Sequence, residues 1–145
     1  MFNFSLQNVL EVRKRMERIK YKEFSGVLLE RQQLSAQIDA RKNRLASAAG
    51  ELDEFKLRGA STAPLQIHDR FRERTKNEMV LLSEQLREKE QTLEVKRKEL
   101  VEARRAHRTL EILRDKERDR YEVGLARQER TVMDEIATNY HLYHR

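Results

Sequence analysis

Residues 79–136 read MVLLSEQLREKEQTLEVKRKELVEARRAHRTLEILRDKERDRYEVGLARQERTVMDEI. Leucines and other apolar or adaptable side chains recur in this stretch with steps of three and four residues. The recurring positions are Met79, Leu82, Leu86, Lys89, Leu93, Lys96, Leu100, Ala103, His107, Leu110, Leu113, Glu117, Tyr121, Leu125, Gln128, Val132 and Ile136. This spacing, kept for about eight heptads, predicts a long helix whose narrow apolar stripe needs a partner stripe.

The first half of the chain carries a second stripe of the same kind. Its members are Leu6, Val9, Val12, Met16, Ile19, Phe24, Val27, Arg31, Leu34, Ile38, Arg41, Leu45, Ala48, Leu52 and Phe55. We expect a first helix over about residues 4–57, with Asn3 or Ser5 capping its start. Gly26 and Gly50 lie inside this helix and mark places where it can bend, because each glycine costs about 1 kcal/mol against alanine.

The turn between the two helices is expected within residues 58–69. Gly59 can adopt the left-handed conformation that ends a helix. One interpretation starts the second helix at Ser61 or Thr62, with Pro64 in its first turn. The other keeps a longer loop and starts the helix at Asp69, so that it covers about residues 69–140.

Two helices joined by a short connection lie antiparallel, so the expected fold is all-α, a long antiparallel two-helix coiled coil forming one domain. Folding the chain about residue 63 pairs positions whose numbers add up to about 126. This register sets Leu45 opposite Leu82, Leu34 opposite Leu93 and Leu6 opposite Tyr121.

With that register, the first helix is exhausted near residue 126. The end of the second helix, from about residue 127, is then an overhang of about 25 to 30 Å without an intrachain partner. It still carries apolar residues at helical spacing, namely Val132, Met133, Ile136, Tyr140 and Tyr143. An amphipathic helix end with nothing to bury against predicts a binding site for another protein.

The composition agrees with a helical rod, because 39% of the residues are charged and 38% hydrophobic, which leaves too little apolar surface for a large core. The absence of cysteine excludes disulfides and cysteine-based zinc sites. We find no signal peptide and no span of about 18 apolar residues, so a soluble cytoplasmic protein is expected.

Two basic clusters contribute to the net charge of +6. They are Arg13, Lys14, Arg15, Arg18, Lys20 and Lys22 in the first half, and Lys96, Arg97, Lys98, Arg104, Arg105 and Arg108 in the second. They form either a solvated face, interleaved with glutamates, or a docking surface for an acidic partner. Few aromatic residues lie among them to stack on bases, so no nucleic acid is expected as a partner.

The sequence shows no catalytic motif, so we expect neither an enzyme nor a bound cofactor. His141 and His144 are three residues apart, but no second pair is close in sequence, and no metal site is expected. His107 occupies a stripe position opposite Ile19 or Lys20, where it is either a tolerated core residue or a pH sensor.

Two segments resemble a known family. FNFSLQNVLEVR (residues 2–13) is similar to the start of FliJ-type flagellar export proteins. LEILRDK (110–116), Tyr121, RQE (127–129) and MDEIA (133–137) are similar to the carboxy-terminal half of that family. The resemblance covers nearly the full length and is least specific around the expected turn.

The resemblance implies a non-enzymatic, stalk-like cytoplasmic protein of a flagellar type III export apparatus, held peripherally at the inner membrane by its partners. The end with both termini would insert into a hexameric export ATPase. Another surface would contact the cytoplasmic domain of the export gate membrane protein and export chaperones.

We assign candidate residues on this basis. The candidate ring contacts are Val132, Met133, Asp134, Ile136 and Tyr140. Weaker candidates for the gate or for the acidic rim of the ring are Arg104, Arg105 and Arg108. The alternatives are an injectisome-type secretion stalk of the same architecture, a basic coiled coil that binds nucleic acid, and a dimeric scaffold.

Overall fold

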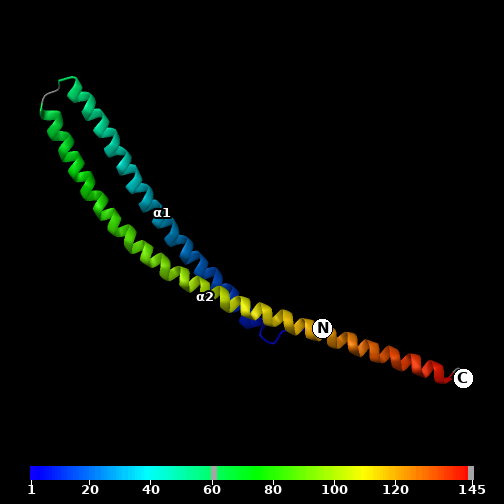
Figure 1. Cartoon of the computed structure of the whole chain (residues 1–145). Coiled ribbons are helices and arrows are strands. Elements are labelled where there is room, and N and C mark those ends of the chain that lie inside the picture. The colour runs from blue at the N-terminus through cyan, green and yellow to red at the C-terminus, as the bar shows by residue number, and fades with distance from the viewer. Residues whose placement is uncertain (60–61, 144–145) are drawn as a thin grey trace. The chain divides into compact units, whose positions relative to one another are not determined.

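The computed structural model describes residues 1–59 and 62–143. It contains two helices, α1 (Gln7–Leu57) and α2 (Thr62–Tyr143), which pack against each other as a long antiparallel coiled coil (Figure 1). No strand occurs in the two described ranges. The predicted fold class is therefore confirmed.

The turn is short. Gly59 has a φ of 71°, which confirms the left-handed glycine, and its N–H donates to the carbonyl oxygen of Lys56 at 3.2 Å. Because α2 starts at Thr62, with Pro64 in its first turn, the start predicted at Asp69 is wrong. Ser61, the alternative cap, lies outside the described residues.

The chain divides into two compact units. We call Lys20–Leu100 the turn unit, and Met1–Ile19 together with Val101–Arg145 the terminal unit. Each contains a segment of α1 and a segment of α2. No helix in the described part of the chain is long and apolar enough to cross a membrane.

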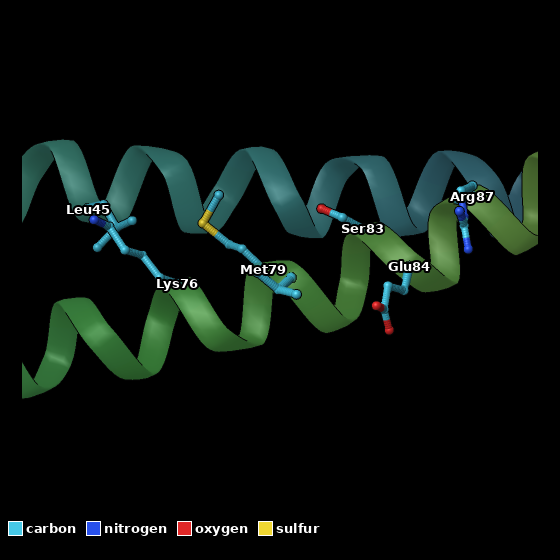
Figure 2. A pocket seen from close by; sticks show the side chains of 7 residues that line it. Leu45, Lys76, Met79, Ser83, Glu84 and Arg87 are labelled. Atoms are coloured by element: carbon cyan, nitrogen blue, oxygen red, sulfur yellow. The ribbon is translucent and has the colours of Figure 1, made fainter.

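The register of the turn unit differs from the predicted one. Leu45 lines a shallow groove with Lys76, Met79 and Val80 rather than lying opposite Leu82. In Figure 2 the Met79 side chain reaches from α2 toward α1, whereas Glu84 points away from α1. The register centred on residue 63 is therefore wrong. Each residue of α1 lies opposite a residue of α2 that is closer to the turn than predicted.

Leu34 gives the same result, because it lines a groove with Gln85 and Lys89, not with Leu93. Ion pairs between the helices fix the actual register. In four of them the residue numbers add up to 119, namely Lys20–Glu99, Glu23–Lys96, Glu30–Lys89 and Arg41–Glu78. This sum differs from the predicted 126 by one heptad, and two heptad stripes fit each other equally well after such a shift.

Charge distinguishes the two registers. Besides these four pairs, Arg31 contacts Glu90 at 3.3 Å. A shift of α2 by seven residues would bring Arg31 to Arg97 and Lys20 to Ala106. Each exposed pair is weak alone, but the shift would remove several attractions and create a repulsion between like charges. The ion pairs thus select one register among those that the leucines allow.

Four of these residues form a closed ring of ion pairs. Lys20 lies 3.1 Å from Glu99 and 3.4 Å from Glu23, and Lys96 lies 3.0 Å from Glu23 and 3.3 Å from Glu99. Hydrogen bonds from Lys96 and Lys20 lower the pKa of Glu23 and Glu99, respectively. The same contacts raise the pKa of both lysines. The charged forms of all four groups therefore stabilise the folded chain.

We expect the glutamate contribution to disappear at acidic pH. Glu23 and Glu99 have pKa values below the ordinary 4.5 in the folded state, so their contribution is complete above pH 4.5 and is lost as the pH falls through the folded values. The double variant Glu23→Gln/Glu99→Gln should melt at a lower temperature than the wild type at pH 7. At pH 3 this gap, measured by circular dichroism, should shrink.

The matched control for this experiment is Glu84→Gln/Glu88→Gln. Neither side chain makes an ion pair with a described residue. The difference in melting temperature between this control and the wild type should therefore not shrink between pH 7 and pH 3. If the gap for Glu23→Gln/Glu99→Gln is as large at pH 3 as at pH 7, the ring of ion pairs contributes nothing to stability.

The left-handed glycine gives a second prediction. Gly59→Ala should lower the free energy of unfolding by about 1 kcal/mol, because an L-residue is strained at positive φ. Gly50→Ala is the matched control, since a Cβ at either position meets nothing within 4 Å. Because Gly50 lies in the interior of α1, Gly50→Ala should stabilise the chain by about 0.5 to 1 kcal/mol. Urea denaturation followed at 222 nm measures both, and the same sign for both variants would contradict the assignment.

Candidate functional site

The first residues of the terminal unit pack on α2 around Tyr121. The N-terminal ammonium donates to the Tyr121 hydroxyl oxygen at 2.9 Å, and the ring centroids of Phe2 and Tyr121 are 5.8 Å apart. Phe4 and Leu10 are buried, with exposed fractions of 5% and 4%. The sequence predicted Leu6 opposite Tyr121, and this prediction is wrong because Met1 and Phe2 lie there.

The N-terminus of α1 is also capped differently from the prediction. The backbone N–H of Gln7 donates to the carbonyl oxygen of Phe4 at 3.1 Å. Neither Asn3 nor Ser5 makes a hydrogen bond with any described residue, so the predicted side-chain cap is not formed. Burial of Phe4 and this backbone bond define the start of the helix instead.

Beyond Tyr121, α2 continues past the N-terminal end of α1 (Figure 1). All described residues from Leu125 to Tyr143 are exposed. We call residues 125–143 the overhang, which starts close to the predicted residue 127. It is helical over all these residues.

The five predicted ring contacts all lie on the overhang. At about 100° per residue, Val132, Met133, Ile136 and Tyr140 share one face of the helix, while Asp134 lies on the opposite face. The four large side chains are exposed by 53%, 68%, 59% and 63%, in that order. The overhang thus presents an apolar face to its surroundings, and on the opposite face Asp134 lies between Arg127 and Arg130.

Glu17 holds α1 to α2 in the terminal unit. Its two carboxylate oxygens lie 2.6 Å from Nδ1 of His107 and 3.2 Å from Nε of Arg104. His107 is also 3.5 Å from Glu111 through Nε2. The partner of His107 is therefore Glu17, and not Ile19 or Lys20 as predicted.

This arrangement bears on the predicted basic site. Arg104 contacts Glu17, and Arg108 contacts Glu111 at 3.1 Å. Arg105 makes no ion pair with a described residue. Arg105 is thus the member of this cluster whose charge is not already matched within the described part of the chain.

The seam predicted for the beginning of α1 is wrong. Val9, Val12, Met16 and Ile19 are exposed by 42%, 54%, 43% and 47%, and we call them the outer stripe. The residues that face α2 are Leu10 and Glu17, which follow from counting heptads backwards from Phe24. The sequence holds the signal for this, because the step from Ile19 to Phe24 is five residues and interrupts the alternation of three and four.

Sequence reasoning also missed a groove beside the turn. It is lined by apolar side chains of both helices, including Leu52, Phe55 and Phe71, and by His68. Both ring nitrogens of His68 are buried there without a hydrogen-bond partner. His144 lies outside the described residues, so the structure does not test the pair of His141 and His144.

Comparison with protein families identifies the chain. The family model described as Flagellar FliJ protein matches residues 2–145. The chain belongs to the FliJ family. It is therefore a protein related to flagellar export. No curated protein and no solved structure matched the sequence significantly.

For this FliJ-family chain, the packing around Tyr121 gives a prediction. Phe4→Ala should lower the free energy of unfolding by about 2 kcal/mol, less than in a globular core because a rod relaxes around the cavity more easily. Phe55→Ala is the control, since Phe55 is 47% exposed and should lose less. Urea denaturation measures both, and an equal loss for the two variants would show that Phe4 does not anchor the terminal unit.

Proposed function

We propose that this chain is a non-enzymatic central stalk that couples the hexameric ATPase of a flagellar type III export apparatus to the export gate. One observation carries the proposal, namely the exposed overhang of α2 with its apolar face. Family membership supplies the context of flagellar export. A single helix that extends beyond its coiled coil has the dimensions to enter the central hole of a protein ring.

The two faces of the overhang suit a ring. In a six-membered ring, identical subunits surround the helix, so some meet Val132, Ile136 and Tyr140 while others meet Asp134. Burial of the apolar face supplies affinity, at about 25 cal/mol per Å² of apolar area. The difference between the faces makes the subunits inequivalent, which a coupling protein requires.

The remaining contacts belong to the same proposal. Arg105, with weaker support from Arg104 and Arg108, is a candidate for binding the gate or the acidic rim of the ring. Export chaperones are further partners. These contacts would hold the protein peripherally at the cytoplasmic side of the inner membrane.

Two observations weigh against the alternatives. The family match favours the flagellar apparatus over an injectisome. Binding of nucleic acid is less favoured because some of the basic residues, among them Lys20 and Lys96 of the two basic clusters, already pair with glutamates across the helices.

Removal of the overhang tests the function. A chain that ends at Ala126 should keep its helicity per residue and its thermal transition, since the deleted side chains do not pack on α1. It should no longer bind the export ATPase or stimulate ATP hydrolysis. Full stimulation by the truncated chain would contradict the proposal.

A point variant sharpens this test. Val132→Gln/Ile136→Gln should weaken ATPase binding about tenfold, because two aliphatic side chains that become partly buried in the proposed complex are lost. Leu29→Gln/Leu81→Gln is the matched control, because these side chains are exposed by 55% and 61% in the turn unit. The control should bind the ATPase as the wild type does, and equal losses for both variants would mean that the overhang has no specific role.

A further inference from the structure

The outer stripe is a second coiled-coil seam on α1. Val9, Val12, Met16 and Ile19 follow each other at steps of three, four and three, the spacing of a helix that packs along another helix. The face that contacts α2, through Leu10 and Glu17, lies about 130° away from the centre of the outer stripe around α1. The beginning of α1 thus has two apolar faces, and α2 covers one of them.

Charges around the outer stripe are not compensated within the described part of the chain. By helix geometry, Arg13 and Arg15 lie on its two sides, each about 80° from its centre. The side chains of Arg13, Lys14, Arg15 and Arg18 make no hydrogen bond or ion pair with any described residue. In the turn unit, by contrast, the lysines and arginines beside the seam have glutamate partners on the other helix.

We propose that the outer stripe binds an amphipathic helix of a partner protein whose own apolar seam is flanked by glutamate or aspartate. The apolar residues of the two helices would pack together, and the acidic flanks would pair with Arg13 and Arg15, as residues beside a seam do in coiled coils. This inference goes beyond the stalk function, because it does not involve the overhang.

The size of the stripe indicates a transient interaction. Residues 9–19 span about 15 Å of helix, which matches two to three turns of a partner. Such a contact buries much less than the roughly 800 Å² per partner of a standard stable interface. Rapid binding and release are expected, with electrostatic attraction contributing to the rate of association.

A designed peptide tests the proposal. The probe is a fluorescein-labelled helix of three heptads with leucine at the two seam positions and glutamate at the two flanking positions. The comparison peptide has lysine in place of glutamate. Fluorescence anisotropy with the full-length chain should show binding of the acidic peptide and at least about tenfold weaker binding of the basic one.

Substitutions then locate the site. Val12→Gln/Ile19→Gln keeps every charge and should weaken binding of the acidic peptide about tenfold. Leu29→Gln/Leu81→Gln, which removes two similarly exposed side chains elsewhere, should leave the binding of the acidic peptide unchanged. Arg13→Gln/Arg15→Gln should weaken binding and reduce its dependence on salt between 50 and about 500 mM.

The outcomes that overturn the proposal are distinct. They are equal binding of the two peptides, or unchanged binding by Val12→Gln/Ile19→Gln. A third is a wild-type dimer, seen in sedimentation velocity, that this variant dissociates, since the outer stripe would then bind a second copy of the chain. The truncation at Ala126 separates this inference from the stalk function, because it removes the overhang and should still bind the acidic peptide.

Discussion

The register between α1 and α2 is the constraint on which the other features depend. Leucine stripes bring the two helices together, but they do not choose among alignments that differ by seven residues. The pairs of Lys20 with Glu99, Glu30 with Lys89 and Arg41 with Glu78 make that choice in the turn unit. Solvent-exposed ion pairs contribute little to stability one by one, and here their value is specificity, because the neighbouring register loses most of these attractions and brings Arg31 to Arg97.

In the terminal unit, the register determines which residues of α2 lie opposite the N-terminal end of α1. Glu17 meets Arg104 and His107, and the first residues of the chain reach Tyr121. Because α1 has no residues left beyond that level, α2 continues as a single helix with apolar side chains exposed. The overhang is thus a direct result of the unequal lengths of the two helices.

The terminal unit presents two apolar surfaces of different electrostatic character. On the overhang, charges of both signs accompany the apolar face, since Arg127 and Arg130 lie beside Asp134, whereas the outer stripe is flanked by Arg13 and Arg15. Surfaces with different charged neighbours favour different partners, because juxtaposed like charges cost binding energy. Under the two proposals above, the terminal unit would hold two partners at once.

The sequence by itself determined the fold class, the left-handed turn at Gly59 and the family resemblance, because heptad spacing, glycine at a helix end and short sequence motifs are local signals. It also indicated an unpaired end of α2. Only the tertiary structure decided which residues face each other and which apolar residues at the start of α1 are exposed. A heptad pattern repeats every seven residues, so it does not distinguish registers one heptad apart, and apolar residues at steps of three and four fit either of two helix faces. Contacts between distant residues, such as Lys20 with Glu99 and Glu17 with His107, resolve both ambiguities, and they exist only in the folded chain.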